Sequence, residues 1–342
     1  MSFDADILVV GGGPGGLATA LHARAQGLSV IIAEPRDAPI DKACGEGLMP
    51  GGLAELAALG VDPAGMPFRG IAYSDGKRRA EACFRDGVGR AVLGRGIRRT
   101  TLHAAMAARA KEVDTDWVST KITSVTQDAD GVTAGGIRAR YLVGADGLHS
   151  AVRRSAGIDA AVGSPRRVGL RRHYTVPVWS DFVEVHWSPF GEAYVTPVEP
   201  DLVGVAILST DRADLSCFPW LEARLRGLSP SRERGCGPLR QVVSRRVAGR
   251  VLLVGDAAGY EDALTGEGMS LAVKQAAAAV AAIAADRPAQ YEKDWHRITR
   301  RYRLLTRGLV LATATRFGKR AIVPGAAALP AAFQLAINTL GH

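Results

Sequence analysis

The feature that most constrains this 342-residue chain is a glycine-rich turn near the N-terminus, between an apolar run and a helical pattern. Residues 5–10, ADILVV, suit a buried parallel strand, and residues 11–16, GGGPGG, match the spacing GxGxxG. In such a strand–turn–helix unit, backbone N–H groups reach a pyrophosphate at the positive helix end. The alternative is a purely structural turn. We expect the phosphates of a dinucleotide to lie beside Gly11, Gly13, Pro14, Gly15 and Gly16.

A carboxylate ends the next predicted strand, SVIIAE, at residues 29–34. Glu34 follows Gly11 by 23 residues, close to the spacing at which an acidic side chain binds the ribose hydroxyls of a dinucleotide. It favours an unphosphorylated adenosine ribose. NAD and FAD both meet these requirements, so the N-terminal signature leaves the choice between them open.

Two later motifs repeat the pattern of a buried strand that ends in Asp and Gly. Residues 141–158 run from such a strand into Asp146-Gly147 and a helix. Residues 249–280 run through Gly255-Asp256 and a glycine-rich loop into a long alanine-rich helix. Taken alone, each motif is equally typical of an Asp-Gly turn that closes a strand.

With these three motifs in this order, roughly residues 4–285 resemble the FAD-dependent monooxygenase and geranylgeranyl reductase superfamily, the flavoproteins related to para-hydroxybenzoate hydroxylase. The resemblance implies an α/β fold with a Rossmann-like FAD-binding domain of the GR2 type, an inserted antiparallel β-sheet substrate domain and a helical C-terminus. It also implies FAD as the cofactor and NAD(P)H as the electron donor. No metal is expected, because the sequence contains no metal-ligand cluster.

The resemblance assigns roles to individual residues. Asp256 is expected at the ribityl chain, Asp146-Gly147 at the pyrophosphate, and Arg99, with Arg98 as the alternative, at the phosphates or the ribityl chain. The residues that it places at FAD are Cys44, Gly45, Arg99, Asp146, Gly147, Gly255, Asp256, Gly266, Glu267, Gly268 and Met269. Many relatives have proline where this chain has Ala263, which predicts a less rigid loop before Gly266.

The chain is predicted to divide into interleaved segments. The FAD-binding segments are residues 1–67, 94–158 and 246–285; residues 68–93 and 159–245 supply the strands of the substrate domain; residues 286–342 form a C-terminal helical region.

The substrate pocket is expected on the inserted sheet. Residues 194–197, YVTP, resemble an aromatic-x-x-Pro strand that passes over the flavin ring in this superfamily. Trp187, Tyr194 and Pro197 are the residues predicted to line the pocket. For His173, which lies beside two arginines, a solvent-facing position is the favoured expectation.

The stretch KACGEGLMPGG, residues 42–52, resembles a cysteine-and-glycine loop of the geranylgeranyl reductase branch that borders the substrate cavity. Its glycines leave backbone room beside a flat cofactor. Cys44 is either a thiol in the cavity wall or a small apolar side chain. Glu46 is either a proton relay or the cap of a turn. These two residues are the candidate catalytic residues.

The resemblance leaves the reaction open. Hydroxylation of a phenolic, quinol or polyketide-type substrate through a flavin C4a-hydroperoxide is placed slightly ahead. The alternatives are reduction of isoprenoid double bonds, as in geranylgeranyl reductases, and a flavoprotein that only carries electrons.

Composition bounds the partners. The four cysteines are scattered and form no CxxC, which fits a reducing cytoplasm without a disulfide framework or zinc site. The net charge of +9 is concentrated in residues 224–250 and 297–320, but no nucleic-acid-binding module accompanies it. Residues 321–340 are uncharged and broken by two prolines. We expect short helices there that pack on the body or make peripheral contact with a membrane.

Overall fold

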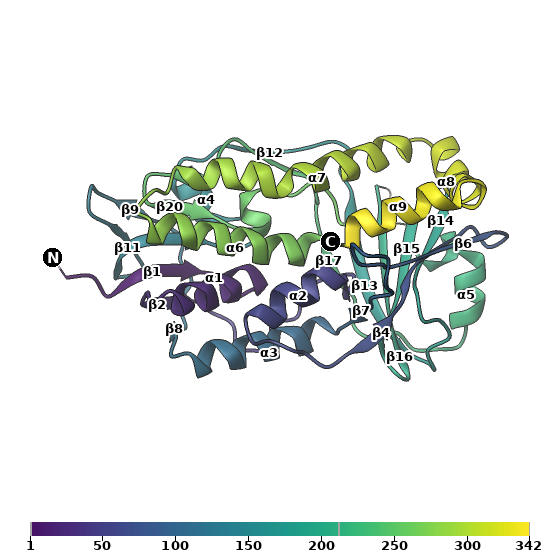
Figure 1. Ribbon diagram of the computed structural model, residues 1–342, viewed down its shortest axis with the longest axis horizontal. Coiled ribbons are helices and arrows are strands. Elements are labelled where there is room, and N and C mark those ends of the chain that lie inside the picture. The colour runs from purple at the N-terminus through teal and green to yellow at the C-terminus, as the bar shows by residue number, and fades with distance from the viewer. Residues whose placement is uncertain (1, 211–212, 342) are drawn as a thin grey trace.

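The computed structural model describes residues 2–210 and 213–341 and contains two large sheets, each with its own helical cover (Figure 1). The first sheet has eight strands in the order β19-β20-β11-β1-β2-β8, with β10 and β9 attached beside β11. Its strands are β1 (Ala5–Val10), β2 (Val30–Ala33), β8 (Asp116–Val118), β9 (Thr126–Gln127), β10 (Val132–Ala134), β11 (Ile137–Gly144), β19 (Val247–Ala248) and β20 (Val251–Leu253).

The centre of this sheet is parallel: β1 pairs with β2 and β11, β11 pairs with β20, and β2 pairs with β8. Parallel strands covered on both faces are apolar throughout, and β1 and β2 are almost completely buried. The predicted Rossmann-like architecture is confirmed. The helices of this half are α1 (Pro14–Ala25), α2 (Pro50–Ala58), α3 (Arg99–Glu112), α4 (Ala151–Ser155), α6 (Gly268–Ala284) and α7 (Gln290–Ala312).

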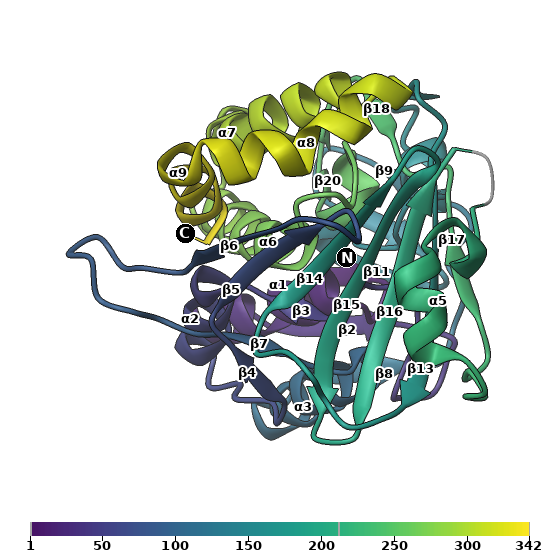
Figure 2. The same cartoon turned by 90° about the vertical axis from the view of Figure 1, so that its right-hand side faces the viewer.

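The second sheet has seven strands in the order β17-β13-β16-β15-β14-β5-β6. These are β5 (Gly70–Ser74), β6 (Arg79–Cys83), β13 (Val168–Thr175), β14 (Val183–Ser188), β15 (Gly191–Glu199), β16 (Leu202–Ser209) and β17 (Arg234–Cys236). All neighbours are antiparallel except β5 and β14, which are parallel. This is the expected inserted sheet, and α5 (Pro219–Leu225) lies across its outer face (Figure 2).

Smaller elements connect the two halves. A three-stranded sheet has the order β3-β7-β4, and β12 pairs with β18. The bounds of these elements are β3 (Gly47–Leu48), β4 (Met66–Phe68), β7 (Gly94–Gly96), β12 (Ala160–Val162), β18 (Gln241–Val243) and the short 3₁₀ helices η1 (Leu215–Cys217) and η2 (Gly255–Ala258).

Two C-terminal helices, α8 (Arg316–Ala328) and α9 (Pro330–Gly341), pack at the β6 edge of the second sheet (Figure 2). The side chains of Gln334 and Asn338 accept hydrogen bonds from the backbone N–H groups of Cys83 and Arg85, both at 3.1 Å. They thereby occupy backbone groups that an edge strand would leave unpaired. Within the described residues no single helix is long and apolar enough to cross a membrane. Together α8 and α9 reach that length and apolar composition, with a bend of 104° between them.

A buried carboxylate also joins strands of the second sheet. Glu184 on β14 accepts hydrogen bonds from Arg79 of β6 at 2.6 Å, from Trp179 at 3.1 Å and, across 3.1 Å, contacts His186. Burial alone would raise the pKa of Glu184, but the hydrogen bonds from His186, Arg79 and Trp179 outweigh it and lower the pKa to about 2.

We predict that Glu184→Gln flattens the acid dependence of stability. Because the folded pKa lies below the unfolded one, the stabilisation is present above about pH 4.5 and is lost as the pH falls through about 2. The wild type should therefore lose about 2–3 kcal/mol more than the variant over this range. Urea unfolding at stepped pH values measures this. Glu81→Gln, which removes an exposed partner of the same arginine, is the control, and an equal effect in both variants would contradict the prediction.

Candidate functional site

Glycine is required at different positions of the first turn for different structural reasons. A Cβ on Gly16 would lie 1.9 Å from the carbonyl oxygen of Gly11, so only glycine lets α1 approach the turn. Gly11 has a φ of +107°, and a Cβ there would lie 2.6 Å from the oxygen of Ala145. A Cβ on Gly13 would meet no atom within 4 Å. Gly13 therefore keeps space open at the N-terminal end of α1, where an anion is favoured.

Glu34 lies buried directly after β2 and faces this turn. Its carboxylate accepts hydrogen bonds from the Gly12 N–H at 2.9 Å and from Arg36 at 2.7 and 3.0 Å. Burial would raise the pKa of Glu34, but the bonds from Arg36 and Gly12 outweigh it and lower the pKa. A charged carboxylate is thus fixed beside the glycine turn. Its binding to a ribose stays a prediction.

Two aspartates from distant motifs lie on the same cavity. Lys42 donates to Asp256 at 3.0 Å. Asp146 accepts from the backbone N–H groups of Ala151 and Val152 through one oxygen, whereas its other oxygen is buried without a hydrogen-bond partner in the described part of the chain. The strands that carry these aspartates, β11 and β20, are neighbours in the first sheet, which explains why residues more than one hundred positions apart meet.

Arg99 begins α3, and its side chain is only 5% exposed. One of its terminal nitrogens, Nη1, is buried without a partner among the described residues. Burial lowers the pKa of Arg99, because the protein does not fully compensate its charge. Arg98, the alternative, is paired with Glu199 at 3.4 Å. Its Nε is also buried without a partner among the described residues, but Arg98 is not part of the cavity wall. The geometry therefore favours Arg99 as the cation beside a bound phosphate.

The loop after Gly255-Asp256 is held by α7. The Tyr302 hydroxyl donates to the Asp262 carbonyl oxygen at 2.8 Å, and the hydroxyls of Thr265 and Thr306 are 3.2 Å apart. The loop was expected to be less rigid because Ala263 replaces a proline. That expectation stays a prediction; the hydrogen bonds from α7 are a restraint that the local sequence does not reveal.

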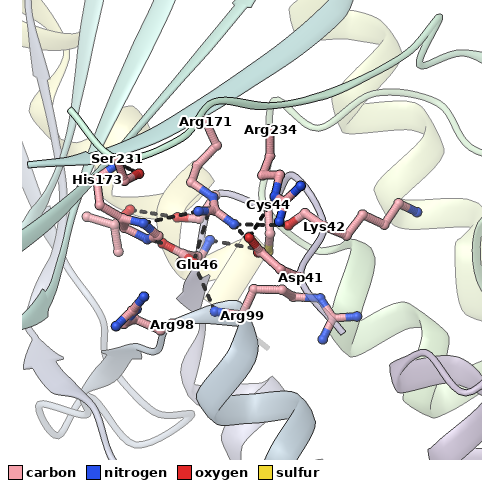
Figure 3. A network of polar contacts seen from close by, with 12 residues as sticks. Asp41, Lys42, Cys44, Glu46, Arg98, Arg99, Arg171, His173, Ser231 and Arg234 are labelled. Atoms are coloured by element: carbon pink, nitrogen blue, oxygen red, sulfur yellow. Dashed lines mark hydrogen bonds and ion pairs between the residues drawn. The ribbon is translucent and has the colours of Figure 1, made fainter. Parts of the chain in front are cut away.

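The loop between β2 and β3 is anchored to the second sheet through a buried polar network (Figure 3). Glu46, which is 1% exposed, contacts His173 Nε2 at 2.7 Å through one oxygen and accepts from the Arg99 backbone N–H at 2.9 Å through the other. Arg171 contacts His173 Nδ1 at 3.0 Å and also binds Asp41, which in turn accepts from Arg234 at 2.9 Å.

The network fixes the proton on His173. A guanidinium has donors only, so Arg171 must donate to Nδ1, and Nε2 must then carry the hydrogen that is donated to Glu46. The expectation that His173 faces solvent is wrong: it is 5% exposed, because Arg171 and His173 lie on the same face of β13, opposite Arg172. Both oxygens of Glu46 are already engaged, which argues for a positioning role.

A single cavity of about 920 Å³ connects these groups and continues towards the C-terminal helices. The predicted residues in its wall are Gly11, Gly13, Pro14, Gly15, Glu34, Cys44, Gly45, Glu46, Arg99, Asp146, Gly147, Tyr194, Gly255, Asp256, Gly266, Gly268 and Met269. Gly16 packs behind the turn. Glu267 lies outside the wall at the start of α6, where burial raises its pKa to about 7. The far end is apolar, with Ile71, Tyr73, Phe84, Val183, Val185, Leu264, Leu309, Ile337 and Leu340.

Two predicted pocket residues lie elsewhere. Pro197 is on the opposite face of β15 from Tyr194, because side chains alternate along a strand; Thr196 shares the face of Tyr194 and lines the cavity instead. Trp187 lies beyond the end of the cavity and packs edge-on against Tyr73, with ring centroids 5.4 Å apart. Neither belongs to the cavity wall, so the assignment of both to the pocket needs correction.

Sequence reasoning missed several residues of the site. Lys42 stands in the glycine-rich loop that was singled out, so its charge was an available signal. Leu309, Ile337 and Leu340 come from the C-terminal region, and their place in the wall depends on tertiary packing that no local motif indicates.

The cavity fits a dinucleotide flavin. It offers an open anion site at Gly13 and a fixed carboxylate at Glu34. It also offers two buried polar atoms, on Arg99 and Asp146, that have no partner in the described part of the chain. Gly45 adds space for a flat ring, since a Cβ there would meet nothing within 4 Å. Glu34, Arg99, Asp146 and Asp256 are the residues that would hold FAD.

Comparisons with known proteins agree with this geometry. Residues 4–221 match the model of a family described as FAD binding domain. A menaquinone reductase from Mycobacterium tuberculosis is 30% identical over 309 residues, which cover 79% of this chain and 74% of the relative. Digeranylgeranylglycerophospholipid reductase 1 from Methanothermobacter thermautotrophicus is 28% identical over 333 residues, or 86% and 82% of the two chains.

A third relative matches a shorter stretch. The 3-(3-hydroxy-phenyl)propionate/3-hydroxycinnamic acid hydroxylase from Mycobacterium avium is 32% identical over 192 residues, which cover 48% of this chain and 33% of the relative. Among solved structures, a geranylgeranyl bacteriochlorophyll reductase-like protein from Thermoplasma acidophilum superposes with a TM-score of 0.77 at 24% identity, over 94% of this chain and 90% of its own. That likeness shows a shared fold.

The space at Gly13 makes a direct prediction. Its φ of −74° suits any residue, so Gly13→Ala should leave the unfolding temperature of the apoprotein unchanged. The added methyl group would occupy the anion site and weaken FAD binding by about 10-fold or more. Titration of the apoprotein with FAD, followed by flavin fluorescence, measures the affinity. Gly87→Ala, which also adds a methyl group to open space, is the control and should bind FAD normally.

Proposed function

Because the chain belongs to the FAD binding domain family and is an FAD-dependent oxidoreductase, we propose that it saturates carbon–carbon double bonds of a hydrophobic isoprenoid substrate. NAD(P)H is the proposed electron source. The two relatives that match most of the chain are named as reductases of menaquinone and of a digeranylgeranyl glycerophospholipid, two molecules with isoprenoid chains. The hydroxylase relative matches less than half of this chain.

The observation that carries the proposal is the continuity of the cavity. It runs from the glycine turn, past Cys44, to an apolar end lined by Ile71, Val183 and Ile337. An isoprenoid chain has no polar group along most of its length, so an apolar wall with few polar groups suits it.

Saturation of a double bond adds a hydride to one carbon and a proton to the other. When bound, FAD supplies the hydride chemistry. The chain must supply the proton, and Cys44 is the proposed donor. Its thiol lies in the cavity wall, and burial, aided by the charge of Glu46, raises its pKa, so that it is protonated at neutral pH.

The surroundings of Cys44 fix its orientation. Its sulfur accepts a hydrogen bond from the Glu46 N–H at 3.3 Å and lies 4.0 Å from the sulfur of Met269. Glu46 itself is the weaker candidate for the donor, because both of its oxygens accept hydrogen bonds. Tyr73, another cavity residue whose pKa burial raises, is a protonated group at the apolar end.

Hydroxylation is the second candidate function, and the relationship to the hydroxylase favours it. A protein that only carries electrons would have no use for the apolar end of the cavity. We also propose a reducing cytoplasmic location, since all four cysteines are free, and peripheral contact with a membrane, where isoprenoid substrates reside.

The reaction can be tested with the FAD-loaded enzyme, NADH or NADPH, and separate isoprenoid and phenolic lipids, with and without oxygen. Anaerobic turnover that adds two hydrogens for each saturated bond, identified by mass spectrometry, is the expected result. Oxygen-dependent turnover with one added oxygen atom would support hydroxylation instead. Stimulation of NAD(P)H oxidation by none of the substrates would overturn both.

For Cys44→Ala we predict a fall in kcat of about 100-fold, the usual size of a lost general acid. FAD affinity should stay unchanged, because the thiol makes no contact that holds the glycine turn. Cys44→Ser should lie between the two enzymes. Cys217→Ala, which alters a cysteine outside the cavity wall, is the control. Equal activity of Cys44→Ala and the wild type would return this thiol to a structural role.

A further inference from the structure

Charge is distributed very unevenly along the chain. Eight of its 43 Lys and Arg residues, and none of its 34 Asp and Glu residues, follow Asp294. This stretch therefore carries +8 of the net charge of +9. It comprises most of α7 together with α8 and α9. Arg300, Arg301, Arg316 and Arg320 in these helices are exposed.

The same helices expose large apolar side chains. Leu311 at the end of α7 is 73% exposed, Phe317 in α8 is 83% exposed and Leu335 in α9 is 69% exposed. Leu329, at the bend between α8 and α9, is 64% exposed. Side chains of this size are normally buried, and their grouping on adjacent helices marks an interaction surface. We call Leu311, Phe317, Leu329 and Leu335, with Arg316 and Arg320, the C-terminal surface.

The inner sides of these helices belong to the fold. Val323 of α8 and Phe333 of α9 are buried in the core beneath the second sheet, and Gln334 is bonded to β6. Leu309 of α7 and Ile337 and Leu340 of α9 line the apolar end of the cavity. The helices therefore separate the cavity from the C-terminal surface. In both views the end of α7, α8 and α9 lie side by side (Figures 1 and 2).

We propose that the C-terminal surface docks on the face of an anionic phospholipid bilayer and presents the apolar end of the cavity to membrane-dissolved substrate. Cationic side chains would contact the headgroups, and Phe317 and the leucines would enter the boundary with the acyl chains. The combination of positive charge with exposed aliphatic side chains suits a lipid surface; nucleic acid would match the charge alone. The inference rests on the proposed function for the identity of the substrate.

Binding is tested by flotation of the FAD-loaded full chain with vesicles of phosphatidylcholine, alone or mixed with phosphatidylglycerol. Tight binding is expected only with the anionic lipid and should weaken with added salt. Each of the changes Phe317→Ser, Leu311→Ser and Arg320→Glu should weaken binding about 10-fold. The controls change exposed residues elsewhere, Val88→Ser and Lys77→Glu, and should bind as the wild type does.

Two outcomes would overturn the proposal: no binding of the wild type to anionic vesicles, or equal binding by the surface and control variants. If the protein also binds DNA, and Phe317→Ser leaves that binding unchanged, the surface would be a site for polyanions in general and not for lipid. Because flotation needs no turnover, its result is independent of the reaction. Normal vesicle binding without reduction of any substrate would contradict the proposed function but not the proposed membrane surface. Turnover of detergent-dispersed substrate by an enzyme that does not bind vesicles would contradict the proposed membrane surface but not the proposed function.

Discussion

The buried carboxylate of Glu46 is the interaction on which the arrangement of the two halves depends. It accepts a hydrogen bond from the backbone N–H of Arg99, the first residue of α3, and contacts His173 on the second sheet. The backbone of Glu46 has a φ of +61°, a conformation that costs a non-glycine residue about 1 kcal/mol. A buried charge is tolerated only when its hydrogen bonds are satisfied. Here the donors come from both halves of the molecule. The hydrogen bonds of this carboxylate can therefore be complete only when the two halves are correctly assembled around the cavity.

The polar network also explains how the cysteine-and-glycine loop can be both open and ordered. Gly45 leaves empty space on the cavity side, while Glu46 and Asp41 are tied down on the other side by Arg171 and its neighbours. The loop therefore keeps a fixed shape without contacts from the cavity. Such preorganisation avoids the entropic cost of ordering the loop when cofactor and substrate bind.

Much of the fold and of the cofactor site could be predicted from sequence, because they depend on local rules. Each of these features follows a strand directly: the turn at residues 11–16, the acid at Glu34 and the two Asp-Gly motifs. The ends of parallel strands lie at one edge of a sheet, so the features come together there. The rest depends on contacts between distant segments. The burial of His173, the restraint of the Ala263 loop by α7 and the displacement of Trp187 beyond the cavity follow from tertiary packing. The position of Pro197 is different: the alternation of side chains along a strand already places it on the opposite face from Tyr194.

Helix α9 supports both the edge of the second sheet and the wall of the cavity. Gln334 and Asn338 occupy hydrogen-bonding groups at the end of the edge strand β6 and just beyond it, and Ile337 and Leu340 line the apolar end of the cavity. A chain that stopped before Pro330 would thus expose a sticky strand edge and an apolar hollow together. Proteolytic removal of α9 would yield an aggregation-prone product, so that only molecules that retain this helix would persist as active enzyme.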